Sequence, residues 1–82
     1  MAKIAIPMPR FGAKMVSGEM LEWKVKVGDH IEEDDEICEV KTEKANAMVE
    51  SVYEGTLVEI VAQPGDSIPV GEPIAYIETE DD

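Results

Sequence analysis

The sequence predicts an all-β domain, a small sandwich or flattened barrel made of two similar halves. Residues 18–40 and 55–77 align without a gap at a shift of 37 positions. The dipeptide Gly-Asp, a turn signal, recurs at matching places in both segments. Apolar and charged side chains alternate along several short stretches, as they do in strands. Each half is too thin to bury its own apolar face, so the halves should pack together about a two-fold pseudo-axis.

The second copy of the repeat decides the secondary structure of the first. Residues 29–52 by themselves could form a helix, because they are rich in Glu, Asp, Lys and Ala and contain neither Gly nor Pro. The matching part of the second copy contains Pro69, Gly71 and Pro73, which a helix interior tolerates poorly. Because both copies should share one structure, both are expected to consist of strands and turns.

Alternating side chains mark the strands in order along the chain. Leu21, Trp23 and Val25 alternate with charged residues in one segment, and Cys38 and Val40 do so in another. Brief extended pieces should follow each Gly-Asp turn. Strands are expected near residues 3–7, 18–26, 37–42, 45–52, 56–62 and 74–78.

The core is expected to consist of the apolar residues that alternate with these polar ones. The candidates are Leu21, Trp23, Val25, Cys38, Val40, Val58, Ile60, Ala62, Ile74 and Ile77. Ile74 and Ile77 conflict with this scheme, since residues three apart point to opposite faces of a regular strand.

A predicted hairpin between the two copies carries a lysine at its tip. Its arms pair if Thr42 faces Ala45, which leaves Glu43 and Lys44 at the central positions of a tight turn. Neither central residue is Gly or Asn, so a type I turn is the more compatible form, with Lys44 projecting from the tip. The same register pairs Val40 with Ala47 and Cys38 with Val49.

The repeat also predicts where this tip lies. The position that matches Lys44 in the second copy is Asp81, in the acidic tail. Two-fold pseudo-symmetry would therefore place the tip and the C-terminus at opposite ends of the domain. A lysine at a hairpin tip is ordinarily just a solvated charge, but Lys44 is the only one of seven cationic residues expected at a turn apex.

Composition limits the partners and the chemistry. The formal net charge of −12 argues against binding to nucleic acid or to anionic membranes, and no apolar run is long enough to span a bilayer. The single cysteine, Cys38, favours a reducing compartment and should be a buried, inert thiol. His30 has no expected co-ligands, so no metal site is predicted. No Ser-His-Asp set or phosphate loop indicates an active site.

These motifs make the chain similar to lipoyl domains of the biotinyl/lipoyl carrier family over about residues 3–78. The resemblance implies two four-stranded antiparallel sheets with two-fold quasi-symmetry, in agreement with the repeat. The opening piece resembles acyltransferase chains of 2-oxo acid dehydrogenase complexes, of the pyruvate or acetoin kind more than the 2-oxoglutarate kind. The pieces that carry the resemblance are IPMPRFGAKMVSGEMLEW (6–23), VGDHI (27–31), EVKTEKA (39–45), EGTLVEI (54–60) and PGDSIPVGEPIAYI (64–77).

The resemblance implies that Lys44 carries lipoate in amide linkage, with Thr42, Glu43 and Ala45 as recognition residues around it. The family's usual pattern is Asp-Lys-Ala preceded by Glu-Thr or Glu-Ser. Here Glu43 keeps the acid before the lysine, one methylene longer, and Lys41 stands where the family usually has an acid.

The implied function is that of a swinging arm that moves acyl groups and reducing equivalents between active sites. The implied partners are a thiamine-diphosphate-dependent 2-oxo acid decarboxylase, an acyltransferase catalytic domain, dihydrolipoamide dehydrogenase, and a lipoate ligase or lipoyl transferase. Arg10, Phe11 and Gly12 lie in the loop that is the candidate contact with partner enzymes, and the resemblance implies that this loop lies near the hairpin. For Phe11, partial packing into the core is an equal alternative.

The chain is expected to have no active site of its own and to be part of a dihydrolipoyl acyltransferase chain. Residues 1–78 would be the carrier domain, and residues 79–82 would begin an acidic linker or tail. A prokaryotic cytoplasm is the expected compartment, in preference to the mitochondrial matrix.

Two alternative functions share the same fold. Biotin acceptor lysines usually stand between two methionines, whereas Lys44 stands between Glu43 and Ala45, which favours lipoate over biotin. The other alternative is an unmodified interaction module of the same sandwich type, in which Lys44 would carry no cargo.

Overall fold

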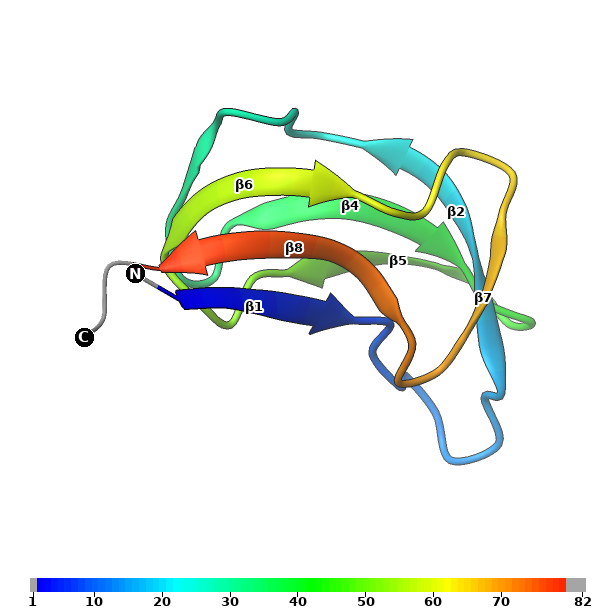
Figure 1. The fold of residues 1–82 in the computed structure, drawn as a ribbon. Coiled ribbons are helices and arrows are strands. Elements are labelled where there is room, and N and C mark those ends of the chain that lie inside the picture. The colour runs from blue at the N-terminus through cyan, green and yellow to red at the C-terminus, as the bar shows by residue number, and fades with distance from the viewer. Residues whose placement is uncertain (1, 80–82) are drawn as a thin grey trace.

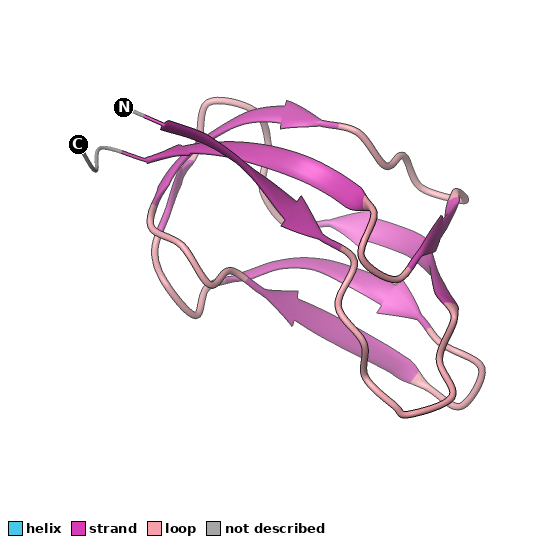
Figure 2. Ribbon diagram, turned by 60° about the horizontal axis from the view of Figure 1, so that its bottom comes forward, coloured by secondary structure: helices cyan, strands magenta, loops and turns pink. Residues whose placement is uncertain are grey.

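A computed structural model of the chain describes residues 2–79, and its regular structure there consists of strands alone (Figures 1 and 2). The eight strands are β1 (Ala2–Pro7), β2 (Ser17–Trp23), β3 (His30–Ile31), β4 (Glu36–Lys41), β5 (Asn46–Glu50), β6 (Gly55–Ile60), β7 (Ser67–Pro69) and β8 (Pro73–Thr79). Over this part of the chain, no helix has the length and apolarity needed to cross a bilayer. The short strands β3 and β7 are the extended pieces predicted after the two Gly-Asp turns.

The strands form two four-stranded antiparallel sheets, ordered β1-β8-β6-β3 and β5-β4-β2-β7. The two orders are equivalent, so the predicted sandwich with two-fold pseudo-symmetry is confirmed. Each half of the repeat contributes to both sheets, because β3 follows β2 in the chain but pairs with β6, and β7 follows β6 but pairs with β2. The halves are therefore interlocked and could not separate without breaking both sheets.

The first Gly-Asp turn is bonded to the opposite half of the repeat. The Gly28 N–H donates to the Leu57 carbonyl at 2.8 Å, and the Leu57 N–H donates to the Asp29 carbonyl at 2.9 Å. Within the turn, the Asp29 carboxylate accepts a bond from the Lys26 N–H at 3.0 Å. Gly28 has a φ of +100°, a conformation that costs a residue without a Cβ little.

The second Gly-Asp turn repeats these bonds at equivalent positions. The Gly65 N–H donates to the Met20 carbonyl at 2.7 Å, and the Met20 N–H donates to the Asp66 carbonyl at 2.8 Å. The Asp66 carboxylate accepts a bond from the Gln63 N–H at 2.9 Å. Each half thus closes the other through its backbone, which explains why the glycine and aspartate recur in both copies.

Two equivalent β-bulges change which residues of β2 and β6 face the core. The pairing of β2 with β4 skips Leu21, and the pairing of β6 with β8 skips Val58. The residues before the bulges, Met20 and Leu57, are fully buried, whereas Leu21 and Val58 are only half-buried. The prediction that Leu21 and Val58 belong to the buried core was wrong, because a bulge inverts the inward and outward alternation of a strand.

A second pair of bulges removes the conflict between Ile74 and Ile77. The pairing of β8 with β1 skips Ile74, and the pairing of β4 with β5 skips the equivalent Ile37. The extra residue lets Ile74 and Ile77 both point inward, and both are fully buried. Ile37 and its neighbour Cys38 are buried together for the same reason.

The other residues predicted for the core are either buried or partly buried. Cys38, Val40, Ala62, Ile74 and Ile77 are buried, as predicted. Trp23, Val25 and Ile60 are half-buried and pack against the core from its edge. The buried apolar set is Ile6, Met8, Met15, Met20, Ile31, Ile37, Cys38, Val40, Val49, Leu57, Ala62, Ile74, Ala75 and Ile77.

Several predicted strands were too long at one end. β2 ends at Trp23 rather than at residue 26, β5 ends at Glu50 rather than at 52, and β6 ends at Ile60 rather than at 62. At the end of β2, the Trp23 indole N–H donates to the Ala62 carbonyl at 2.7 Å, and the Lys24 N–H still donates to the Ile37 carbonyl at 2.8 Å. The residues beyond these strands form turns and loops.

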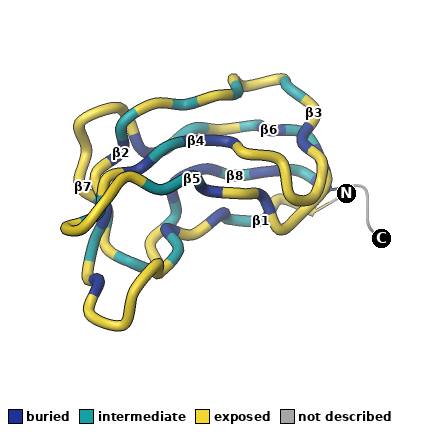
Figure 3. The backbone as a smooth tube through the Cα atoms, turned by 180° about the vertical axis from the view of Figure 1, so that it is seen from behind, coloured by how far each residue is buried: buried dark blue, intermediate teal, exposed yellow. Residues whose placement is uncertain are grey.

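The hairpin between β4 and β5 lies at the end of the sandwich opposite to the start of β1 and the end of β8 (Figures 1 and 3). β8 ends at Thr79, and Asp81, the predicted counterpart of Lys44, lies outside the described residues. The arrangement agrees with the predicted separation of the hairpin tip from the C-terminal strand.

We expect Gly55→Ala to lower the free energy of unfolding by about 1–3 kcal/mol. A Cβ at Gly55 would collide with the backbone carbonyl of Glu78, so β6 would have to move away from β8. Urea denaturation measures the change. Gly12→Ala is the matched control, because a Cβ at Gly12 would meet no atom within 4 Å. Equal stability of the two variants would contradict the tight packing of β6 on β8.

Candidate functional site

The hairpin at the candidate site has the predicted register. Val40 pairs with Ala47 and Cys38 pairs with Val49 across β4 and β5. At the end of the ladder, the Thr42 N–H donates to the Ala45 carbonyl at 2.9 Å. These pairs leave residues 43 and 44 at the apex, so the structure confirms the predicted position of the lysine.

The side chain of Thr42 closes the turn from inside. Its hydroxyl donates to the Ala45 carbonyl at 2.7 Å and accepts bonds from the Ala45 and Lys44 N–H groups at 3.2 and 3.3 Å. Among the described residues, Asp34 alone combines a positive φ with a side chain, so residues 43–44 do not form a primed turn. Thr42 is half-buried, whereas Glu43, Lys44 and Ala45 are exposed.

The loop that follows β1 lies beside the hairpin, as the family resemblance implied. Residues 11–15 and 42–47 together line a groove of about 480 Å³, and Lys44 is part of its wall. Phe11 lines this groove and is 44% exposed, and it is not among the partly buried apolar residues that pack against the core. Gly12 also lines the groove, but Arg10 does not, and its guanidinium bonds the Ala13 carbonyl at 3.0 Å within the loop.

A smaller hollow of about 310 Å³ adjoins this groove and shares Lys14 and Glu43 with it. Its other charged lining residues are Lys41 from β4 and Glu19 from β2. Lys41 pairs directly with Glu19 across β2 and β4. Opposite charges at paired positions stabilise a sheet, which gives the unusual lysine at position 41 a physical reason within this chain.

Cys38 is buried in the core and is not exposed at the hairpin tip. Its side chain is fully buried, as predicted. Burial raises the pKa of the Cys38 thiol to about 12, because the thiolate would lose its hydration. The thiol is therefore protonated at neutral pH and is a poor nucleophile.

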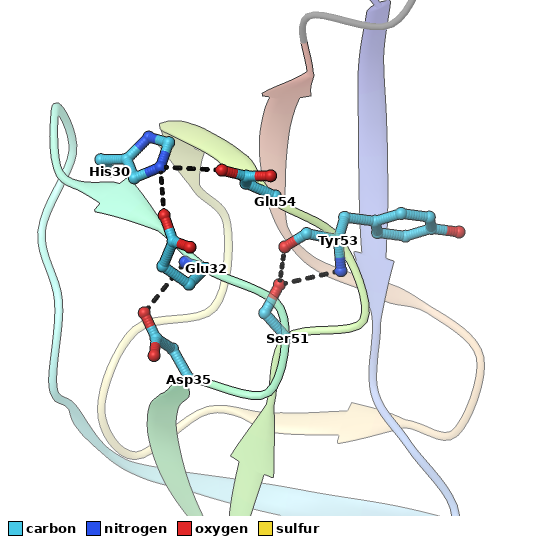
Figure 4. A network of polar contacts seen from close by, with 6 residues as sticks. All are labelled: His30, Glu32, Asp35, Ser51, Tyr53 and Glu54. Carbon is cyan, nitrogen blue, oxygen red and sulfur yellow. Dashed lines mark hydrogen bonds and ion pairs between the residues drawn. The ribbon is translucent and has the colours of Figure 1, made fainter.

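A second polar cluster lies around His30 (Figure 4), for which no co-ligands were predicted from the sequence. His30 Nε2 is 2.6 Å from a Glu32 oxygen and 3.4 Å from a Glu54 oxygen. The three side chains each offer one possible ligand atom, and these atoms lie within 4.8 Å of one another. The expectation that His30 has no possible co-ligands was wrong, because β3 pairs with β6 and so brings His30 close to Glu54, which precedes β6.

The His30 cluster is an exposed ion pair. The hydrogen bond to Glu32 raises the pKa of His30 above 6.5, and the charges of Glu32 and Glu54 add to this effect. All three side chains are exposed, so solvent screens the interaction. The cluster shares the end of the sandwich with Tyr53, which bonds Ser51 in the adjacent turn.

A protein-family model matches nearly the whole chain. The family described as "Biotin-requiring enzyme", the biotinyl/lipoyl family, matches residues 4–77, which is nearly the whole chain. The two halves, both Gly-Asp turns and the hairpin all lie within the matched range.

Two curated relatives come from Bacillus subtilis. The chain is 41% identical over 80 residues to the lipoamide acyltransferase component of the branched-chain alpha-keto acid dehydrogenase complex. It is 35% identical over 74 residues to the dihydrolipoyllysine-residue acetyltransferase component of the acetoin cleaving system. These matches cover 98% and 90% of this chain but only 19% of each relative, so the chain spans about a fifth of their length.

Solved structures show the same fold. The lipoyl domain of the 2-oxoglutarate dehydrogenase complex from Azotobacter vinelandii matches with a TM-score of 0.73 and 28% identity, over 93% of this chain and 96% of that domain. Urea carboxylase from Kluyveromyces lactis matches with a TM-score of 0.79 and 20% identity, over 95% of this chain and 6% of that protein. At that identity, the second match shows the fold alone.

We expect Thr42→Val to destabilise the hairpin by about 1 kcal/mol, since it removes a hydroxyl that both donates and accepts bonds in the turn. Urea denaturation measures the global effect, and amide hydrogen exchange at Ala45 measures the local one. Thr42→Ser keeps the hydroxyl and is the control. If the valine and serine variants exchange Ala45 equally slowly, the hydroxyl does not hold the turn.

We expect the His30 cluster to make stability depend on pH. A pKa raised in the folded state gives a stabilisation that is complete below the unfolded pKa near 6.5 and disappears as pH rises through the folded pKa. The unmodified sequence should therefore exceed the His30→Gln variant in free energy of unfolding by more at about pH 6 than at about pH 9. Urea denaturation at the two pH values and low salt measures it. A difference that does not change with pH would argue against the ion pair.

Proposed function

The chain belongs to the biotinyl/lipoyl family and is a carrier domain of the lipoyl type, and we propose that Lys44 is the residue that carries the lipoate. The observation that supports this assignment is the position of Lys44. It stands exposed at the apex of the hairpin that joins the two halves of the repeat, at the end of the sandwich away from the end of β8 (Figure 1).

The residues around Lys44 fit the attachment of an acyl group. Attachment requires the neutral amine of Lys44 to attack the carbonyl carbon of an activated lipoate. A C–N bond forms, the activating group leaves with the electrons of its bond to carbon, and the nitrogen loses a proton. An exposed apex lets a modifying enzyme reach the amine, and the bonds of Thr42 hold the apex in one conformation for recognition.

The domain presents the arm and leaves the chemistry to the arm and to other active sites. When attached, the lipoyl group supplies a dithiolane that can be reduced and acylated. The chain contributes an attachment point on a rigid hairpin, a neighbouring loop that can contact other proteins, and a protonated, buried Cys38 that does not compete with the arm's sulfurs.

The activities for which the relatives are named support a place in a 2-oxo acid dehydrogenase complex. The chain is proposed to be the carrier domain of a dihydrolipoyl acyltransferase. Its proposed partners are the acyltransferase catalytic domain, a thiamine-diphosphate-dependent decarboxylase, dihydrolipoamide dehydrogenase, and a lipoate ligase or lipoyl transferase. Tethering the arm near these active sites raises its effective concentration at each of them.

The domain boundary and the compartment are part of the same proposal. The proposed carrier domain comprises residues 1–78, followed by an acidic linker, and its last strand in the structure, β8, runs to Thr79. A prokaryotic cytoplasm is proposed as the compartment, and the single, buried thiol of Cys38 is consistent with a reducing environment.

The residues next to the lysine favour lipoate over biotin as the cargo. Glu43 and Ala45 flank Lys44, and the nearest methionine, Met48, lies within β5 and is half-buried. The methionine pair expected around a biotin acceptor is therefore missing from this hairpin.

We expect Lys44→Arg to abolish lipoylation, because the guanidinium stays protonated and cannot attack the activated acyl group. Intact mass measurement after coexpression with a lipoate ligase tests this. Lys41→Arg is the matched control on the same hairpin and should gain one lipoyl group, as should the unmodified sequence. A lipoyl group on the Lys44→Arg variant would refute the assignment, and a biotin-sized increment on the unmodified sequence would refute the cargo.

A further inference from the structure

The groove beside Lys44 includes the proposed attachment residue in its wall, whereas the smaller hollow next to it does not. One wall is the loop 11–15 and the other is the hairpin 42–47, and Lys44 is part of the second wall. Phe11 and Ala13 face it from the loop, and Ala45 and Ala47 face it from the hairpin. Most of its exposed lining is apolar, although Lys14 and Glu43 also border it.

The loop wall of this groove is held in place. Met15 is buried in the core, and the Phe11 N–H points to the Met15 sulfur at 3.2 Å. Arg10 bonds the Ala13 carbonyl at 3.0 Å, which closes the loop on itself. Phe11 nevertheless keeps 44% of its surface exposed, so an anchored loop presents an aromatic ring to the groove.

We propose that the lipoyl arm on Lys44 folds back into this groove, with its hydrocarbon chain and dithiolane against Phe11, Ala13 and Ala47. This inference rests on the proposed function. The occupant follows from covalent attachment, since an acyl chain on Lys44 starts at the groove wall and, with a reach on the order of 10 Å, extends along it.

The chemistry of the groove matches that of the arm. The hydrocarbon chain gains by leaving water, and sulfur makes favourable contacts with an aromatic ring such as that of Phe11. The adjoining hollow is a poorer match, because it is smaller, about 310 Å³, and adds the charged side chains of Glu19 and Lys41 to Lys14 and Glu43, which line both.

Docking would make the arm alternate between a folded-back and an extended form. Only the extended form exposes the sulfurs, so the rate at which a small reagent attacks them falls in proportion to the docked fraction. A docked fraction between about one half and nine tenths slows the reaction about two- to tenfold relative to free dihydrolipoamide. Phe11 then decides how long the arm stays docked.

Thiol alkylation tests the inference on the lipoylated 82-residue chain. The arm is reduced with a phosphine and alkylated with N-ethylmaleimide, while Cys38 stays unreactive because it is buried and its pKa is about 12. The unmodified sequence should react about two- to tenfold more slowly than free dihydrolipoamide. Phe11→Ala should recover most of that difference.

Val16→Ala is the matched control on the same loop. Val16 is 79% exposed and lines the other hollow, so its loss should leave the alkylation rate unchanged. Amide NMR gives an independent readout. Lipoylation should shift the signals of Gly12, Ala13 and Ala47, and Phe11→Ala should reduce those shifts without altering signals from strands far from the loop.

The two levels of the proposal fail in different ways. If mass measurement finds no lipoyl group on Lys44, the proposed function is wrong and this inference is wrong with it. If the chain is lipoylated but reacts as fast as free dihydrolipoamide, with amide shifts confined to residues 42–46, the docking is wrong and the carrier function stands. An equal rate increase in Phe11→Ala and Val16→Ala would also refute a specific role for Phe11.

Discussion

The rest of the structure depends on the backbone bonds by which each Gly-Asp turn closes the opposite half. Gly28 and Asp29 bond Leu57, and the second turn makes the same bonds to Met20. A chain of this size buries only a modest core, and the exchange of β3 and β7 between sheets joins both halves into one cooperative unit. The turns therefore place four strands on each side of the core, and the hairpin and the loop take their positions from those strands.

The same two-fold arrangement explains why the loop after β1 lies next to the hairpin. β1 and β5 occupy equivalent edges of the two sheets, so the connection from β1 to β2 passes the end of the sandwich where β4 turns into β5. Met8 and Met15 anchor this connection in the core, and Gly18 leaves room for both, since a Cβ there would lie 3.1 Å from each. The result is a hydrogen-bonded apex with an anchored aromatic neighbour.

The placement of reactive groups suits a domain that carries chemistry without performing it. Cys38 is close to the hairpin in sequence but is buried and protonated, so it offers no thiol to a sulfur-bearing arm. The His30 ion pair is exposed but lies among the turns at the other end of the sandwich (Figures 3 and 4). Lys41 departs from the family pattern, and its cross-strand pairing with Glu19 keeps the charge balanced on the sheet.

The sequence by itself determined the repeat, the strand-and-turn character of both halves, and the hairpin register that puts Lys44 at the apex. These features rest on local alternation and turn residues, which can be compared between two copies. Only the tertiary structure decided that Leu21 turns away from the core while Ile74 stays in it. A single bulged residue reverses which side chains of a strand face inward, and no residue pattern in this sequence marked the bulges. The His30 cluster and the groove beside Lys44 were also beyond the sequence, since each joins segments that meet only through long-range strand pairing.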